Sequence, residues 1–143
     1  MKVQIQRLVP EAALPEYAHG PQEDAGLDLR SIEAILLEPG VPVAVRTGLA
    51  IELPPGYEAQ VRPRSGLALK HAITVLNSPG TIDPGYRGEI CVILLNLGKA
   101  AYPIQVGDRI AQMVVARYEP IDWVEATLSD TTRGTGGFGS SGL

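Results

Sequence analysis

Residues 47–62 read TGLAIELPPGYEAQVR and contain the clearest strand pattern of the chain. Apolar residues occupy every second position in 49–53 and again in 57–61, which is the period of a β-strand with one buried face. Pro54-Pro55-Gly56 separates the two runs and is typical of a tight turn. The stretch therefore predicts two antiparallel strands joined as a hairpin.

The rest of the chain follows the same pattern. Sixteen glycines and twelve prolines leave no room for a long amphipathic helix, so strands must build the fold. The only helical turn expected is Ser65–His71, with Ser65 as its N-cap. Many short strands at this spacing predict an antiparallel β sandwich or barrel. Further strands are expected at Val3–Leu8, Gly26–Arg30, Ala34–Leu37, Val41–Arg46, Ile73–Leu76, Glu89–Leu97, Ala101–Ile104, Arg109–Arg117 and Ile121–Val124.

One domain accounts for the length and composition. The chain has 143 residues and is 45% hydrophobic and 20% charged, the profile of an ordinary globular domain. We expect residues 1–128 to form the β domain. Residues 129–143 are rich in glycine, serine and threonine and lack periodicity, which predicts a flexible arm. The longest apolar run, Ile90–Leu95, is too short to span a bilayer, and the N-terminus has no signal-peptide core, so we expect no membrane association and a cytoplasmic location.

Charge and cysteine content narrow the function. The net charge of −4 argues against a nucleic-acid binder, yet residues 61–117 hold seven basic and three acidic side chains. Arg outnumbers Lys nine to three, which favours recognition of an anionic small molecule; scattered surface solvation is the alternative. Cys91, His19 and His71 cannot complete a disulfide framework or a structural zinc site, so any metal is held by oxygens or by the substrate.

Two loops combine residues suited to phosphate and base recognition. Arg64-Ser65-Gly66 lies where a strand meets the helical turn, so amides, a hydroxyl and a guanidinium could converge on one anion; a capped turn is the alternative. In the Pro-Gly turn 81–89, Asp83 could act as a general base beside Tyr86, unless it only bonds its own backbone. Asn77 can donate and accept at once, as reading a base edge requires, or it can cap its loop.

Two polar residues interrupt apolar strands. Gln112 lies in the run Ile110–Val115, where its amide needs a partner or an exposed position. Asp28 could reach the water shell of a Mg²⁺ ion or pair with an arginine. In the tail, Arg133 and Phe138 are unexpected in a plain linker and favour an arm that closes over a nucleotide.

In this order and register, five segments resemble the homotrimeric deoxyuridine triphosphate nucleotidohydrolase (dUTPase) family. The resemblance covers nearly the whole chain, and five motifs in register are together highly specific. The segments are Ala25-Gly26-Leu27-Asp28-Leu29, Pro63-Arg64-Ser65-Gly66-Leu67-Ala68, Asn77 with Gly80-Thr81-Ile82-Asp83-Pro84-Gly85-Tyr86-Arg87-Gly88, Gly107-Asp108-Arg109-Ile110-Ala111-Gln112, and Arg133-Gly134-Thr135-Gly136-Gly137-Phe138-Gly139-Ser140-Ser141-Gly142.

The resemblance implies a β jelly-roll subunit, a homotrimer with active sites shared between subunits, and Mg²⁺-dependent hydrolysis of dUTP to dUMP and pyrophosphate. This reaction keeps uracil out of DNA and supplies dUMP for thymidylate synthesis. Two other functions stay open. A dCTP deaminase of the same fold is disfavoured by Tyr86 and by the arm with Phe138. An inactive trimeric jelly-roll binding module is disfavoured by Asp83 and the arm.

The resemblance also implies roles for the motif residues. Asp83 orients and deprotonates the water that attacks the α-phosphorus, and Asp28 contacts metal-bound water. Tyr86 packs on the deoxyribose and excludes a 2′-hydroxyl, while the arm brings Phe138 over the uracil. The remaining substrate-binding residues are Asn77, Gly80, Thr81 and Ile82 at the uracil, Arg64, Ser65, Gly66 and Gln112 at the phosphates, and Arg133, Gly137, Gly139, Ser140 and Ser141 in the arm.

Overall fold

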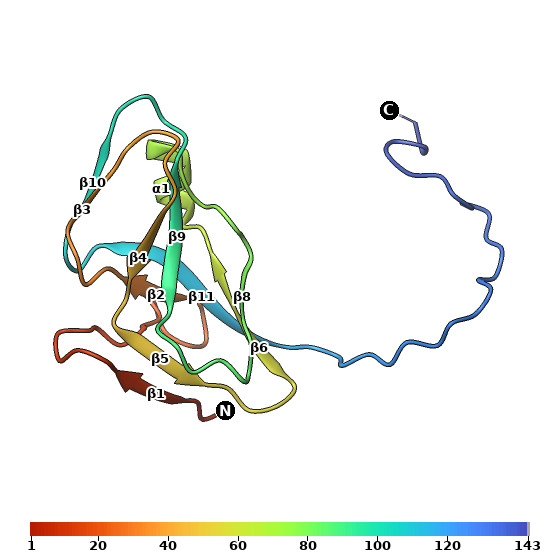
Figure 1. Ribbon diagram of the computed structural model, residues 1–143, viewed down its shortest axis with the longest axis horizontal. Helices are drawn as coiled ribbons and strands as arrows, with labels where there is room; N and C mark the ends of the chain where they lie inside the picture. Colours follow the sequence, from red (N-terminus) through yellow and green to blue (C-terminus); the bar gives the residue numbers. More distant parts are fainter. Residues whose placement is uncertain (143) are drawn as a thin grey trace.

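A computed structural model describes residues 1–142 as a β-sheet body with one short helix and an extended C-terminal segment (Figure 1). Every strand pair is antiparallel, which confirms the predicted all-β, jelly-roll-like class with one helical turn. The elements are β1 (Gln4–Arg7), β2 (Leu27–Arg30), β3 (Ile35–Leu37), β4 (Val43–Arg46), β5 (Leu49–Glu52), β6 (Tyr57–Arg62), α1 (Ser65–His71), β7 (Ile73–Val75), β8 (Gly80–Ile82), β9 (Cys91–Asn96), β10 (Tyr102–Ile104) and β11 (Arg109–Arg117).

Four small sheets enclose one hydrophobic core. Their strand orders are β2-β11-β6-β8, β4-β9-β7, β1-β5 and β10-β3. The inward faces of strands from different sheets meet in the core, as in a β sandwich. Its fully buried aliphatic side chains include Leu29, Leu37, Leu49, Ile73, Leu94 and Ile104.

The two strands within residues 47–62 form, but they do not pair with each other. β5 pairs with β1, whereas β6 pairs with β11 and β8. Pro54 and Pro55 have no backbone N–H to donate to a hairpin ladder. A turn closed by the Tyr57 N–H donating to Pro54 O (3.2 Å) instead carries the chain from one sheet into the other. The strands are confirmed and the hairpin is wrong.

Three smaller predictions also differ from the structure. Ser65 is the first helical residue of α1, the N-cap is Arg64, and no side chain caps the helix. β8 was not expected, because three residues that begin with a glycine show no readable alternation. Residues 121–124 are extended and exposed but form no strand, since no strand of the described chain lies beside them.

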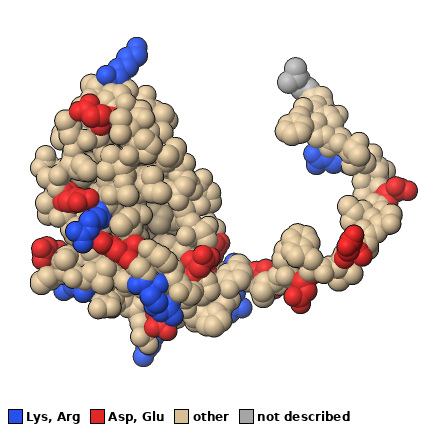
Figure 2. All heavy atoms as spheres, in the orientation of Figure 1, with Lys and Arg blue, Asp and Glu red and all other residues tan. Residues whose placement is uncertain are grey.

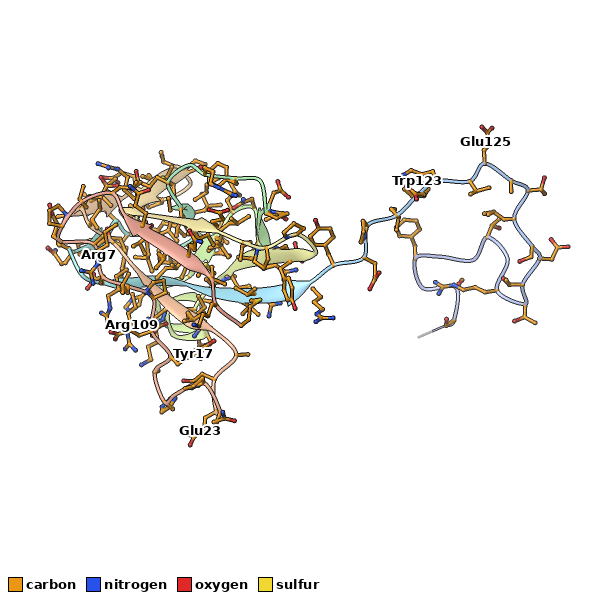
Figure 3. The ribbon with its side chains drawn as sticks, turned by 90° about the horizontal axis from the view of Figure 1, so that it is seen from below. Arg7, Tyr17, Glu23, Arg109, Trp123 and Glu125 are labelled. Carbon is orange, nitrogen blue, oxygen red and sulfur yellow. The ribbon has the colours of Figure 1, made fainter. Side chains whose placement is uncertain are left out.

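The C-terminal segment leaves the body after β11. Beyond Tyr118, whose N–H donates to Gly56 O (3.1 Å), backbone hydrogen bonds occur only within local turns of residues 131–142. The segment curves far away from the sheets (Figure 1). Figure 3 shows Trp123 and Glu125 well clear of the body, and Trp123 is 88% exposed. Among residues 1–142, no helix has the length and apolar character that a membrane crossing requires.

Candidate functional site

A pocket of about 250 Å³ lies between β8 and the segment that leads into β9. At ~30 Å³ per water, it has room for about eight waters, which is enough for an aromatic ring. Aliphatic side chains make up much of its wall, and a few polar groups are interspersed, as in most small-molecule sites. It brings together five residues predicted to bind substrate: Asn77, Gly80, Thr81, Ile82 and Tyr86.

Strand pairing fixes the wall of this pocket. β8 pairs with β6, with Gly80 opposite Val61, and its Ile82 side chain is buried. Gly80 leaves space for the side-chain amide of Asn77, because a Cβ atom at position 80 would lie 3.2 Å from Asn77 Nδ2. Asn77 thus sits against the start of β8 at the edge of the pocket.

Asp83 immediately follows β8, in a tight turn at the edge of this pocket. The Tyr86 N–H donates to Asp83 O (3.1 Å), which closes the turn around Pro84 and Gly85. The side chain of Asp83 is exposed. The turn therefore places Asp83 directly after Ile82 and three residues before Tyr86, both of which line the pocket.

Cys91 also lines the pocket, where its surroundings disfavour the thiolate form. Burial, followed by the nearby Glu89 carboxylate, raises the pKa of the Cys91 thiol above its ordinary value. A thiol with a raised pKa stays protonated at neutral pH and is a weak nucleophile. Cys91 therefore acts as part of the apolar wall.

A second group of predicted residues gathers around Asp28, whose side chain is 8% exposed. Arg109 Nη1 donates to Asp28 Oδ2 (3.2 Å), and Arg64 Nη1 donates to Arg109 O (3.2 Å). Arg64 Nε lies 3.2 Å from Asp28 Oδ1, but within residues 1–142 neither of these two buried atoms has a hydrogen-bond partner. Two guanidinium groups against one carboxylate leave an excess of positive charge, which suits an anion.

Gln112 joins this group through sheet register. It lies opposite Asp28 on β2 and opposite Arg62 on β6. A Cβ atom at position 26 would lie 3.3 Å from Gln112 Cδ, so Gly26 leaves space for the amide. Ser65 and Gly66 follow Arg64 at the exposed start of α1.

Arg109 is the residue of this group that sequence reasoning did not assign to a site. The sequence Gly107-Asp108-Arg109 is also typical of an ordinary turn with an ion pair. The register between β11 and β2 shifts between Arg109 and Ala111, and this irregularity accompanies the contact of Arg109 with Asp28. Nothing in the sequence indicates such a shift.

The residues around Asp28 fit a Mg²⁺ ion only if the substrate supplies most of its ligands. Within the part of the chain described, no three Asp, Glu, His or Cys side chains gather closely enough to hold a metal. Asp28 Oδ1 is buried and lacks a hydrogen bond, so it could accept one from metal-bound water. Mg²⁺ commonly keeps several waters and takes other ligands from substrate phosphates.

The arm residues lie apart from both groups. Arg133 Nε donates to Gly136 O (2.9 Å) within the arm, and the Phe138 ring is fully exposed. Gly137, Gly139, Ser140 and Ser141 lie in the same exposed segment, far from the sheets in Figure 1. One chain therefore presents its predicted site residues in three separate places.

The dUTPase family model matches residues 12–142. The chain belongs to the dUTPase family. A deoxyuridine 5'-triphosphate nucleotidohydrolase from Solibacter usitatus (strain Ellin6076) is 67% identical over 142 residues, which cover 99% of this chain and 97% of that protein. The enzyme of the same name from Gloeothece citriformis (strain PCC 7424) is 57% identical over 144 residues, which cover 100% of this chain and 98% of that protein.

Solved dUTPase structures have the same fold. A dUTPase of Staphylococcus phage 80alpha matches with a TM-score of 0.89 at 27% identity, covering 98% of each chain. Another structure of that enzyme, with dUpNHpp, matches with a TM-score of 0.84 at 29% identity over 99% of each chain. The dUTPase of phage phi11 of S. aureus, described with a structural Mg(II) ion, has a TM-score of 0.83 at 25% identity, covering 92% of this chain and 100% of that one.

Proposed function

We propose that this protein hydrolyses dUTP to dUMP and pyrophosphate, with water attacking the α-phosphorus. The observation that carries the proposal is the pocket lined by Asn77, residues 80–82 and Tyr86, with Asp83 in the turn at its edge. Family membership and relatives named deoxyuridine 5'-triphosphate nucleotidohydrolase support it. The pocket suits a single ring, and the charged group around Asp28 suits phosphates.

The pocket residues select the base and the sugar. The Asn77 amide both donates and accepts, which matches the alternating donors and acceptors on the edge of uracil. Backbone groups of Gly80, Thr81 and Ile82 complete this recognition. The Tyr86 ring packs on the deoxyribose and leaves no space for a 2′-hydroxyl.

Hydrolysis depends on positioning and on neutralising charge. Asp83 orients the attacking water and accepts its proton, as a general base within hydrogen-bond reach does. Arg64, Ser65, Gly66 and Gln112 hold the phosphates, so charge that develops on their oxygens meets preorganised donors. A Mg²⁺ ion would be held mainly by the substrate phosphates, with Asp28 within reach of its water shell, and would supply further neutralisation of charge on the triphosphate.

We infer that the complete site forms in a homotrimer. The arm of one chain lies far from its own pocket and from the group around Asp28, which suits a site completed by the arm of a neighbouring copy. The arm from a neighbouring subunit then brings Phe138 over the base and Arg133, Ser140 and Ser141 onto the phosphates. Closure of such an arm excludes water other than the nucleophile.

The outer face of the sheet β4-β9-β7 supports self-association. Along β9, Val92 and Leu94 are buried in the core, while Ile93 and Leu95 lie on the opposite, partly exposed face. Ile93 lines the substrate pocket, so the part of this face that a second copy could cover lies beside the pocket. Figure 2 shows few charged side chains over β9 and β8, whereas charges gather at the lower left of the same view. An apolar face with few charges is typical of a surface that a second copy covers.

A nucleotide screen tests the proposed reaction. We expect pyrophosphate release from dUTP and at least tenfold lower kcat/KM for dCTP, dTTP and UTP, because the pocket reads both base and sugar. Ammonia is measured in the same reactions. Release of ammonia from dCTP would indicate the deaminase instead, and turnover of none of the four would indicate an inactive binding module.

The role of Tyr86 is tested by Tyr86→Ala. The ratio of kcat/KM for dUTP to that for UTP is expected to fall at least tenfold, about 1.4 kcal/mol of discrimination, because the ring no longer excludes the 2′-hydroxyl. Tyr17→Ala is the matched control, since Tyr17 lies in the loop before β2, outside the pocket (Figure 3). An unchanged ratio in Tyr86→Ala would assign sugar selection to another residue.

A further inference from the structure

Gly88 lies directly against the ring of Tyr86. A Cβ atom at position 88 would lie 2.6 Å from Tyr86 Cζ and 2.9 Å from Tyr86 Cε2, closer than real Cβ atoms approach other heavy atoms. The φ angle of Gly88 is not among the positive ones, so any residue could adopt its backbone conformation. The ring, rather than the backbone, therefore requires glycine at this position.

Hydrogen bonding holds the ring in the same place. The Tyr86 hydroxyl donates to Glu89 O (2.9 Å), so the ring folds back over Gly88 to reach the next carbonyl. Tyr86 remains 46% exposed, which leaves part of the ring open at the pocket. The contact with Gly88 and the hydrogen bond to Glu89 O together set the orientation of the exposed part of the Tyr86 ring.

The carbonyl that accepts the tyrosine hydroxyl is itself anchored. The Glu89 carboxylate accepts from the Gly48 N–H (2.8 Å) and from Arg46 Nε (3.1 Å). One residue further, the buried Thr47 hydroxyl donates to Ile90 O (2.6 Å). Three consecutive residues, the last of β4 and the two that follow it, thus hold residues 89–90 in place. The Tyr86 hydroxyl therefore bonds to an anchored segment of backbone.

We propose that Gly88 is a specificity-determining position that acts through Tyr86. By lacking a side chain, it lets the ring lie against the main chain and bond to Glu89 O, in the one orientation that packs on a deoxyribose and excludes a 2′-hydroxyl. The inference rests on the proposed function, in which Tyr86 selects the sugar. Gly88 touches no substrate, so it is a positioning residue.

Gly88→Ala tests the proposal. The atoms that the new methyl group would meet are at the free end of the tyrosine side chain, so the ring swings away while the backbone is retained. We expect the dUTP-to-UTP ratio of kcat/KM to fall at least tenfold, with the melting temperature close to that of the wild type. The double variant Gly88→Ala, Tyr86→Ala should discriminate no less than Tyr86→Ala alone, because both changes remove the same contact.

Gly85→Ala is the matched control in the same turn. A Cβ atom at position 85 would meet nothing within 4 Å, and the φ of Gly85 is not positive either. In Gly85→Ala, the ratio of kcat/KM for dUTP to that for UTP should stay within twofold of the wild type. A tenfold fall of this ratio in Gly85→Ala would overturn the proposal. It would mean that any methyl group added in the turn weakens sugar discrimination, whether or not it meets the Tyr86 ring.

The remaining outcomes separate this proposal from the proposed function. If Tyr86→Ala lowers the ratio and a folded Gly88→Ala does not, the positioning role of Gly88 is wrong and the role of Tyr86 stands. If Tyr86→Ala leaves the ratio unchanged, both are wrong. Should Gly88→Ala fail to fold, Tyr86→Phe decides: it removes only the bond to Glu89 O, and an undiminished ratio overturns the proposal.

Discussion

Replacement of Asp83 by asparagine is expected to lower kcat by roughly 10²–10⁴-fold, the usual contribution of a positioned general base. Asparagine has nearly the same shape and also suits the first position of a tight turn, so the turn around Pro84 should persist. It cannot accept the proton of the attacking water. At 1.36 kcal/mol per tenfold, the loss corresponds to about 2.7–5.4 kcal/mol of barrier height.

The measurement pairs single-turnover kinetics with binding of a non-hydrolysable imido analogue of dUTP. Binding by Asp83→Asn should stay within about twofold of the wild type, because the carboxylate acts on the water. Asp122→Asn, the same change at an exposed site in the extended segment, is the control and should keep full activity. Retention of more than a third of wild-type kcat by Asp83→Asn would remove Asp83 from the role of base.

Local pattern was enough to predict most strands of this fold. β11 forms over Arg109–Arg117 and α1 over Ser65–His71, both as expected, because a short apolar run and a short run of helix-forming residues are local signals. The hairpin between β5 and β6 failed for a non-local reason. The choice of partner strand depends on which apolar faces meet in the core, and Pro54-Pro55-Gly56 permits either a hairpin or a crossing between sheets.

The candidate site was less predictable than the strands. Motif order singled out Asn77, Asp83 and Tyr86, and the structure places them around one pocket or at its edge. The contact of the Tyr86 ring with Gly88 could not be inferred from the sequence. A glycine after a turn gives the same sequence signal whether it is needed for the backbone conformation or for space beside a neighbouring ring. The contact of Arg109 with Asp28 likewise accompanies a register shift that leaves no mark in the sequence.

Truncation after Thr132 is expected to lower kcat/KM by on the order of 10²-fold or more, because an arm that closes the site positions the substrate and excludes water. The melting temperature should change little, since the removed segment is exposed and its hydrogen bonds reach no further than the adjacent Thr131. Activity and thermal unfolding are measured on the same preparation. A large drop in melting temperature would show that the tail stabilises the body.

The same truncation tests whether sites are shared between subunits. Asp83→Asn subunits have an intact arm, and subunits that end at Thr132 have an unaltered Asp83. If base and arm come from different subunits of a trimer, random assortment of an equal mixture completes about a quarter of the sites. Activity should therefore reappear when the two variants are refolded together, and native mass spectrometry establishes that mixed trimers formed. Mixed trimers as inactive as their parents would mean that each chain supplies both its own base and its own arm.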